Sequence, residues 1–472
     1  MAEVLTPDIC VIGGGPAGQR LAVTAANSGV PVVLIEKGRL GGADLAHGSV
    51  PSKALIAAAG LYDTLRRGPA MGVSGAPLQV NFARLREHVL AAAASVEPAF
   101  SAARLAALGI RVIPGEAKFV DRRAVVADGI VIRARRFVLA TGAVPSLPAI
   151  PGLAGVEPMT LDDAFDLTRK PAHLLLLGAG PHALELAQAY NRLGVDTTVI
   201  GGEAPLADED PELAAIVLGR LAAEGVRFRT GKPVSGVARR RGGIRVTLAG
   251  EEEAVDGSHL LLAMGRAPNI AGLRLEAAGI AFDPDGVVVD RLCRTTNRRV
   301  YAIGDVVAGP ASVARAEHQI DRILLAILYR LPFREYAGRV PQAMFTDPGL
   351  ARIGLSEAEA NRIDRSVRVF RYPVLAGEAS AGERLSEGMI KVVTSRRGRV
   401  LGAAIVARNA AELIVPWSLA VRERMHIRAI AGMPVPHPSH SEISRRVAEA
   451  YDGPGMAPLW RRRLIAFLRR FG

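Results

Sequence analysis

Residues 8–18, DICVIGGGPAG, decide the fold of this chain. Residues 8–12 are mostly apolar and predict a short buried strand, and the glycines after it allow a tight turn into an alanine-rich helix that extends to about Ser28. A second predicted strand, residues 31–35, is followed by Glu36. The order strand, glycine turn, helix, strand and acid is typical of a unit that binds a dinucleotide.

Three glycines and one acid carry the chemistry of this unit. Gly13, Gly15 and Gly18 permit a tight turn and let backbone N–H groups approach a pyrophosphate, whose charge is favoured at a helix N-terminus. Glu36 lies 36 − 13 = 23 residues past Gly13, where a carboxylate can accept hydrogen bonds from a ribose diol. Glycines alone would also suit a helix packed closely on a strand. Because strand, helix and acid are all in place, we expect an adenine dinucleotide here.

The same order of elements recurs later in the chain. Residues 172–177 are apolar, the turn GAGPHA follows, and the next predicted strand covers residues 197–200. The candidate nucleotide-binding residues of this turn are Gly178, Gly180 and Ala183. The strand is followed by Gly201, where a carboxylate would favour NAD and an arginine NADP. Ala183 in the third glycine position slightly favours NADPH, and the choice of coenzyme stays open.

Length and composition indicate an ordered α/β enzyme. A chain of 472 residues predicts about three domains, and 49% hydrophobic with 22% charged residues is a globular profile. Lys and Arg exceed Asp and Glu by 59 − 46 = 13, but no zinc spacing or helix-turn-helix signature accompanies this charge, so we expect no nucleic-acid partner. Cys10 and Cys293 are the only cysteines, which suits a reducing compartment. With no signal-peptide pattern and no run of about twenty apolar residues, we expect a cytoplasmic protein without a spanning helix.

From about Gln342 the pattern changes to period-two alternation, which predicts an antiparallel sheet followed by helices. The predicted strands are residues 345–348, 390–393 and 400–406, the predicted helices lie near 409–425 and 441–451, and residues 452–455 are a predicted linker.

Four further motifs resemble one family, in order along the chain. They are ATG at 140–142, GRAPN at 265–269, YAIGD at 301–305 and FTDPGLARIGL at 345–355. They resemble the pyridine nucleotide–disulfide oxidoreductases, which include dihydrolipoamide dehydrogenase, glutathione reductase, mercuric reductase and the soluble transhydrogenase. The first motif resembles that family's link from the FAD domain to the NAD domain, and the second resembles the link that returns to the FAD domain. The resemblance implies FAD and NAD(P)H as cofactors and a homodimer.

The resemblance also implies an α/β fold with two Rossmann-like dinucleotide-binding domains, for FAD and NAD(P), and a C-terminal α+β dimerisation domain. The implied parts are residues 1–150 (FAD domain, first part), 151–265 (NAD(P) domain), 266–338 (FAD domain, second part), 339–455 (dimerisation domain) and 456–472 (a basic amphipathic tail). Further implied cofactor-binding residues are Gly42, Thr141, Gly142, Gly265, Arg266, Gly304 and Asp305, whose carboxylate in the family typically binds the flavin's ribityl chain.

One departure from the family decides the chemistry. Members of the family have the sequence Gly-Gly-Thr-Cys followed by Gly-Cys-Ile-Pro-Ser-Lys, whereas this chain has GGAD and then GSVPSK. The two positions that match the family's cysteines are therefore Asp44 and Ser49. Disulfide reduction needs one thiolate at the flavin and another that exchanges with substrate, and neither a carboxylate nor a hydroxyl replaces them. We therefore expect no disulfide reduction. The C-terminal cysteine pair of mercuric reductases is also missing, and we predict no metal site.

Four residues match the family's other catalytic positions. Lys53 resembles the lysine beside the flavin N5, and Glu185 the glutamate that pairs with it; the alternative is an ordinary helix ion pair. His437 and Glu442 resemble the segment whose histidine reaches the partner subunit's active site and whose glutamate orients it. That histidine could donate a proton to a reduced acceptor, or it could be a structural remnant.

The last residues predict a basic amphipathic helix. Its apolar residues recur at helical spacing, and arginines occupy mostly the other faces: Trp460, Leu464, Phe467, Leu468 and Phe471 against Arg461, Arg462, Arg463, Arg469 and Arg470. This pattern is typical of a helix on an anionic membrane surface, and we expect a peripheral membrane contact. Packing on the dimer or on a partner protein is the alternative.

These features lead to one functional hypothesis and two alternatives. We expect a homodimeric, FAD-dependent NAD(P)H oxidoreductase that passes electrons directly to a small acceptor such as a quinone. The first alternative is a soluble NAD(P) transhydrogenase, and the second is a non-catalytic flavoprotein that binds a partner and reports redox state.

Overall fold

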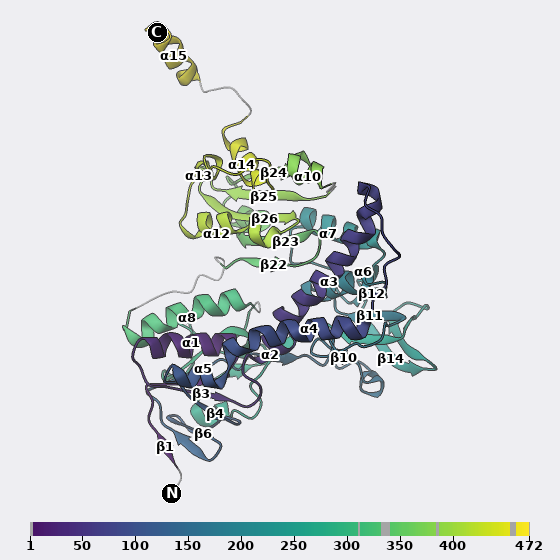
Figure 1. The fold of residues 1–472 in the computed structure, drawn as a ribbon. Coiled ribbons are helices and arrows are strands. Elements are labelled where there is room, and N and C mark those ends of the chain that lie inside the picture. Colours follow the sequence, from purple (N-terminus) through teal and green to yellow (C-terminus); the bar gives the residue numbers. More distant parts are fainter. Residues whose placement is uncertain (1–2, 310–311, 332–339, 384–386, 454–458, 472) are drawn as a thin grey trace. The chain divides into compact units, whose positions relative to one another are not determined.

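The computed structural model describes residues 3–309, 312–331, 340–383, 387–453 and 459–471. The chain divides into two compact units, one formed by residues 1–208 with 218–337 and the other by residues 209–217 with 338–472 (Figure 1).

The first unit contains a five-stranded parallel sheet with the order β21-β8-β2-β3-β4. Its strands are β2 (Ile9–Ile12), β3 (Val32–Glu36), β4 (Arg111–Pro114), β8 (Arg136–Leu139) and β21 (Val300–Ala302). All four residues of β2 are buried, because both faces of a parallel sheet are covered. Helix α1 (Pro16–Asn27) begins with a proline, whose missing N–H costs nothing at that position. Figure 1 shows α1 beside α8 (Val313–Leu328), although they are far apart in sequence.

A second parallel sheet in the same unit repeats this arrangement. Its order is β10-β17-β11-β12-β13, with β10 (Met159–Thr160), β11 (His173–Leu177), β12 (Asp196–Gly201), β13 (Arg227–Thr230) and β17 (His259–Leu262). Helix α6 (Pro181–Arg192) follows β11 as α1 follows β2. Four strands of each sheet correspond, β8-β2-β3-β4 to β17-β11-β12-β13, whereas the edge strand beside β8 is the last of its sheet along the chain (β21) and the one beside β17 is the first (β10). The predicted pair of nucleotide-binding folds is confirmed.

Smaller antiparallel sheets and further helices complete the described part of this unit. The sheets are β1 (Val4–Leu5), β5 (Lys118–Asp121), β6 (Ala124–Ala127) and β7 (Ile130–Ile132), in which β1 pairs parallel with β7; β14 (Val234–Arg240), β15 (Gly243–Leu248) and β16 (Val255–Gly257); β9 (Ala143–Pro145) with β18 (Arg266–Pro268); and β19 (Phe282–Asp283) with β20 (Gly286–Val287). The helices are α2 (Gly42–Ala46), α3 (Ser49–Arg67), α4 (Phe82–Val96) and α5 (Ala102–Ala107). Helix α7 (Pro211–Glu224) has residues in both units.

The helical stretch Phe82–Ala107 passes a length and composition test for a membrane span, which the sequence had not led us to expect. The backbone there is not one continuous α-helix, because a 3-10 turn at Glu97–Phe100 separates α4 from α5. Helix α4 packs on α3, and its Val89 and Ala93 are buried. The stretch is therefore part of the helical layer of this unit in the structure.

The second unit is built on a five-stranded antiparallel sheet with the order β22-β23-β26-β25-β24. The strands are β22 (Gln342–Met344), β23 (Gly349–Gly354), β24 (Arg368–Pro373), β25 (Met389–Thr394) and β26 (Val400–Ala407), and the helices are α9 (Glu357–Ile363), α10 (Glu378–Gly382), α11 (Ala410–Leu413), α12 (Val415–Arg422), α13 (Arg428–Ala431) and α14 (Glu442–Glu449). The core of this unit includes Trp417, which is fully buried and donates a hydrogen bond from its indole N–H to the Ser444 hydroxyl.

One predicted strand of this unit is wrong. Residues 345–348 form the bend between β22 and β23 rather than a strand. The Thr346 hydroxyl donates a hydrogen bond to the Pro348 carbonyl inside this bend. Proline lacks the N–H that a strand donates to its neighbour in a sheet. The proline therefore disfavours a strand here, in spite of the local alternation of apolar residues.

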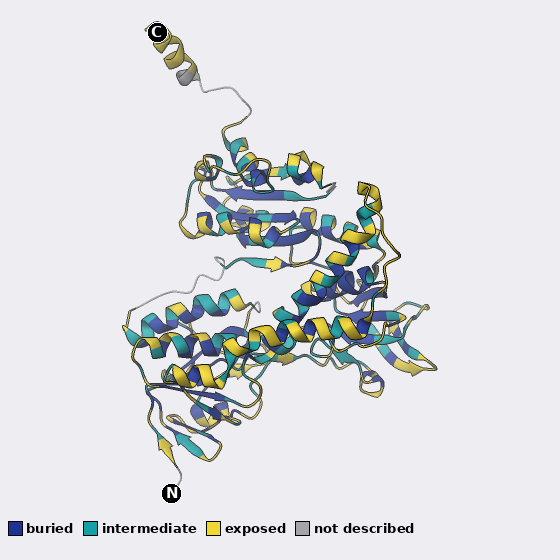
Figure 2. Ribbon diagram, in the orientation of Figure 1, coloured by how far each residue is buried: buried dark blue, intermediate teal, exposed yellow. Residues whose placement is uncertain are grey.

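A last helix, α15 (Leu459–Leu468), carries the tail. Figure 2 shows it exposed along the part that is coloured, and every residue from 462 to 471 is exposed. The helix ends earlier than the sequence pattern suggested, but hydrogen bonds from the N–H groups of Arg470 and Phe471 to the carbonyls of Phe467 and Leu468 continue the turn.

Candidate active site

The first glycine turn is shaped by close backbone contacts. Gly13 has φ +111°, and a Cβ at this residue would lie 2.3 Å from the Ala140 carbonyl oxygen. A Cβ at Gly18 would lie 1.9 Å from the Gly13 carbonyl oxygen. Gly15, at the N-terminus of α1, has no atom within 4 Å of its Cβ position. Two glycines therefore make the turn possible, and the third leaves open space before a helix N-terminus, where a pyrophosphate is favoured.

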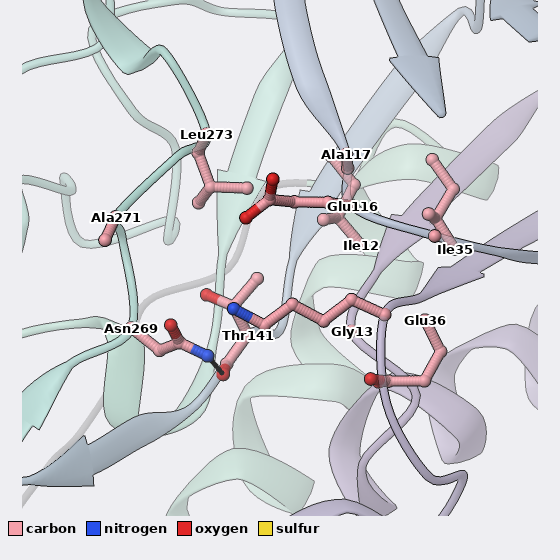
Figure 3. Close-up of a pocket in the computed structure, with 12 residues that line it drawn as sticks. Ile12, Gly13, Ile35, Glu36, Glu116, Ala117, Thr141, Asn269, Ala271 and Leu273 are labelled. Atoms are coloured by element: carbon pink, nitrogen blue, oxygen red, sulfur yellow. Dashed lines mark hydrogen bonds between the residues drawn. The ribbon is translucent and has the colours of Figure 1, made fainter. Parts of the chain in front are cut away.

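Glu36 lies at the end of β3 and closes one side of a pocket. Its carboxylate accepts hydrogen bonds from the backbone N–H groups of Gly14 and Gly38, which fixes its direction. Figure 3 shows Glu36 and Gly13 lining this pocket together with Thr141 and Asn269. Glu36 therefore lines this pocket beside the first glycine turn, and its ribose-binding role stays a prediction.

Thr141 supplies a test of whether the pocket suits a ligand. Its hydroxyl is buried, and within the described part of the chain it has no hydrogen-bond partner. An unsatisfied buried hydroxyl costs about 1–3 kcal/mol, so a polar ligand in the pocket would recover part of that cost. Asn269 donates from its side chain to the Thr141 carbonyl, shown as a dashed line in Figure 3, and from its backbone N–H to the Gly142 carbonyl. The two predicted links between the nucleotide domains, residues 140–142 and 265–269, are thus hydrogen-bonded to each other.

The same two links pair as strands. β9 follows the first link and pairs antiparallel with β18, which begins at Arg266 directly after Gly265. The Arg266 guanidinium donates to the Ala143 carbonyl at 2.8 Å and to the Asp162 carboxylate at 3.2 Å. Arg266 also contributes to the charge environment of Asp305, described next.

Asp305 follows β21 and Gly304, whose N–H donates to the buried Gln319 side chain at 2.9 Å. Burial raises the pKa of Asp305, and the positive charges of Arg266 and Arg315 lower it only in part. A carboxylate held in this way is ready to accept hydrogen bonds from a hydroxylated ligand chain, as the resemblance predicts for FAD.

Asp44 and Ser49 are brought together, as the positions of a cysteine pair would require. Asp44 lies in α2, and its carboxylate accepts a hydrogen bond of 3.2 Å from the Ser49 N–H, the first residue of α3. The carboxylate thereby satisfies one of the N–H groups that α3 leaves unpaired at its start. Gly42, two residues before Asp44, has its Cβ position 3.1 Å from the Gly15 Cα, so this segment lies against the first glycine turn.

Lys53 and Glu185 form the predicted pair. The Lys53 ammonium on α3 lies 3.5 Å from the Glu185 carboxylate on α6; their side chains are 35% and 7% exposed. Burial lowers the pKa of Lys53, and the carboxylate of Glu185 opposes this shift. The pair joins α3, which follows β3 of the first parallel sheet, to α6, which follows β11 of the second. Such a place suits a cation that serves a cofactor between them.

The second glycine turn repeats the first in one contact and departs from it in another. A Cβ at Gly178 would lie 2.2 Å from the Ala263 carbonyl oxygen, and Gly180 has open space at its Cβ position. Ala183 is fully buried and replaces the third glycine without disturbing the helix start. A Cβ at Gly201, the last residue of β12, would lie 3.2 Å from the Ala179 Cβ. No side chain at this position selects a coenzyme.

In the second unit, His437 and Glu442 are in contact. Glu442 begins α14, and its carboxylate lies 2.9 Å from His437 Nδ1. The Ser439 N–H and His437 lower the pKa of Glu442. A second carboxylate, Glu378 of α10, lies 3.3 Å from His437 Nε2. The predicted dyad is therefore present, and Glu378 is an addition that the sequence did not suggest.

Two glutamines at the nucleotide folds also escaped the sequence analysis. The Gln19 amide of α1 donates to the carbonyls of Gly14 and Phe100, and Gln319 holds Gly304 as described above. Gln19 joins the turn just before its own helix to Phe100, 81 residues away, and Gln319 reaches back 15 residues to Gly304, so neither contact belongs to a recognisable spacing.

Comparison with known proteins now identifies the family. The family model described as pyridine nucleotide-disulphide oxidoreductase matches residues 7–319, and the model of its dimerisation domain matches residues 340–448. The chain belongs to the pyridine nucleotide-disulphide oxidoreductases. The predicted family, α/β fold, FAD and NAD(P)H cofactors and dimerisation domain are thereby confirmed.

Three similar proteins illustrate the range of this family. Dihydrolipoyl dehydrogenase of Bacillus subtilis is 32% identical over 457 residues, covering 94% of this chain and 96% of that protein. A protein of Mycobacterium tuberculosis named NAD(P)H dehydrogenase (quinone) is 31% identical over 471 residues, covering 93% of each. The crystal structure of LpdA from Mycobacterium tuberculosis has a TM-score of 0.87 at 28% identity, covering 96% of this chain and all of that one.

The two thiols of this chain lie away from the cysteine-pair positions. Cys10 lies in β2 and Cys293 precedes β21, and both are fully buried. Burial raises the pKa of the Cys10 thiol, so it stays protonated and unreactive. The positions that resemble the family's cysteine pair carry Asp44 and Ser49 in this chain.

Proposed function

We propose that this protein is an FAD-dependent NAD(P)H oxidoreductase that passes electrons directly to a small acceptor, a quinone, without a redox-active disulfide. The observation that carries the proposal is the hydrogen bond between Asp44 and Ser49 at the place of the family's cysteine pair. The net reaction is NAD(P)H + H⁺ + quinone → NAD(P)⁺ + hydroquinone. It balances in atoms and electrons without any sulfur group.

The proposed reaction needs residues that hold FAD and a positive charge beside it. FAD, when bound, supplies the redox chemistry that connects a two-electron donor to a one- or two-electron acceptor. Gly15, Glu36 and Asp305 would hold it, and Lys53 would provide a positive charge where negative charge develops. Burial lowers the pKa of Lys53, and the Glu185 carboxylate opposes that shift and so favours the charged form.

His437 would serve as the proton donor to the acceptor. Glu442 contacts its Nδ1, and Nε2, the nitrogen that would hold the transferred proton, lies 3.3 Å from the Glu378 carboxylate. The dimerisation domain supports a homodimer, in which each His437 would serve the other subunit's site. The relative named NAD(P)H dehydrogenase (quinone) supports the choice of acceptor.

Steady-state turnover tests the proposal. Oxidation of NADH and of NADPH is measured with a panel of benzoquinones and naphthoquinones as acceptors, and dihydrolipoamide and glutathione disulfide serve as contrast substrates. We expect quinone-dependent oxidation of at least one coenzyme and no disulfide turnover. The variant Lys53→Met should lose most of this activity while retaining FAD, whereas Lys118→Met, which changes an exposed lysine of the same unit, should not. Rapid turnover of lipoamide substrates would refute the proposal.

Transhydrogenation between NADH and NADP⁺ is a second candidate, favoured by one observation. Gly201 ends β12 without a side chain that selects either coenzyme. Adding thio-NADP⁺ with NADH would show reduction of the thio-coenzyme at a rate comparable to quinone reduction. If neither coenzyme bleaches the flavin of the holoprotein, the protein is a binding module rather than an enzyme.

A further inference from the structure

The tail helix α15 presents one apolar face and one arginine face. Residues 462–471 are all exposed, including the apolar side chains of Leu464, Phe467, Leu468 and Phe471, which are 47–74% exposed. At about 100° per residue these four lie within an arc of about 100°. The rings of Phe467 and Phe471 are in contact, with centroids 5.1 Å apart, which agrees with a shared face.

The opposite face is strongly basic. Arg462, Arg463, Arg469 and Arg470 lie about 140–260° around the helix from Leu464. Residues 459–471 contain five arginines and no acidic residue. The strip is therefore bordered by Arg463 on one side and by Ile465 and then Arg469 on the other, and residues 459–471 place no acidic residue beside it.

We infer that this surface, Leu464, Phe467, Leu468 and Phe471 with the four arginines, docks on an anionic lipid membrane. An apolar strip buries at the boundary of headgroups and acyl chains, and long arginine side chains reach the anionic headgroups beside it. A second copy of the same helix is a poor occupant, because its arginines would face those of the first without any acid between them. The inference goes beyond the redox proposal and does not depend on it. If the acceptor is a membrane quinone, the docked tail also brings the enzyme to its substrate.

Vesicle flotation of the full-length holoprotein tests this docking. We expect binding to phosphatidylcholine vesicles containing about one quarter phosphatidylglycerol to exceed binding to pure phosphatidylcholine by at least about tenfold, and to weaken as salt is raised. The double variant Arg469→Gln with Arg470→Gln should lower binding to the anionic vesicles about 10–30-fold.

A matched pair of variants tests the apolar strip. Phe467→Ser should lower vesicle binding about tenfold or more, while Ile465→Ser should change it by less than about threefold, because Ile465 is 52% exposed but lies outside the strip. Turnover with a water-soluble benzoquinone should be unchanged in all these variants, so a failure of docking and a failure of the redox proposal are distinguishable.

Three outcomes would overturn the inference. Wild-type protein could fail to float with anionic vesicles, or Ile465→Ser could lose as much binding as Phe467→Ser. Alternatively, the tail variants could change the sedimentation coefficient of the protein without lipid, which would show that the occupant of the strip is a second copy of the chain.

Discussion

Replacing Glu185 with Gln tests the charge pair at the centre of the proposed site. The change keeps the size of the side chain but removes the carboxylate 3.5 Å from the Lys53 ammonium. Burial already lowers the pKa of Lys53, and Glu185 opposes that shift, so the variant lowers the pKa further. We therefore expect reduction of the flavin by NAD(P)H to slow, and its rate to decline at lower pH than in the wild type as pH is raised.

The structure limits the size of this effect. At 3.5 Å, Coulomb's law gives about 5 kcal/mol at an effective dielectric constant of about 20 and about 1 kcal/mol at the value of water. Because 35% of the Lys53 side chain is exposed, solvent screens the pair and the lower part of this range applies. A loss of about 1–2 kcal/mol corresponds to about a 5–30-fold slower reduction step.

Stopped-flow measurement of flavin bleaching at saturating coenzyme gives the rate constant of flavin reduction. A double-mutant cycle then shows whether Glu185 affects this rate through Lys53. Glu185→Gln should slow the wild type but have little further effect in a Lys53→Met background, because the charge on which Glu185 acts is then absent. Lys53→Arg, which keeps the charge, should retain a larger part of the rate than Lys53→Met. An equal effect of Glu185→Gln in both backgrounds would refute the coupling between the two residues.

Three further changes test other parts of the molecule. Glu36→Gln exchanges a charged for a neutral hydrogen-bond acceptor and should raise the Kd of FAD for the apoprotein about tenfold in reconstitution titrations, and an unchanged Kd would exclude the ribose role. Asp44→Cys together with Ser49→Cys should produce a long-wavelength charge-transfer band on reduction, and its absence in an FAD-containing double variant would show that the loop has diverged from the family. Glu224→Gln removes the carboxylate that binds the buried Arg192 at 2.7 Å, so the free energy of unfolding should fall by about 3–5 kcal/mol in urea denaturation; a loss below about 1 kcal/mol would contradict the importance of that pair.

The parts of the fold that could be predicted are those in which one residue has a strict local requirement. Gly13 and Gly178 each face a carbonyl oxygen less than 2.5 Å from the Cβ position, so no other residue fits without a shift of the backbone. The requirement appears in the sequence as a fixed glycine spacing between a strand and a helix. The links at 140–142 and 265–269 were recognised from family motifs, and β9, directly after the first link, pairs with β18 inside the second.

The parts that could not be predicted depend on contacts between distant segments. Gln319 binds Gly304 from a helix whose sequence pattern shows only an apolar face, and Glu378 reaches His437 from a separate short helix. The buried contact of Asp63 with Arg192 joins α3 to α6, and nothing near either residue in sequence indicates it. Local alternation was misleading at residues 345–348 because a turn proline can lie within an apolar pattern.

The replacement of the cysteine pair has an electrostatic consequence for the proposed reaction. Asp44 brings a negative charge to a place that a neutral disulfide occupies in the family, and the N-terminus of α3 offsets this charge through the Ser49 N–H. Lys53 follows four residues after Ser49 on the same helix, so it lies on the same face as Ser49. If Asp44 keeps the position of the pair beside the flavin, its charge disfavours electron uptake by the flavin, while Lys53 favours it. The balance lowers the affinity of the flavin for electrons relative to a site that has Lys53 alone, and a flavin that holds electrons less tightly gives them more readily to a quinone.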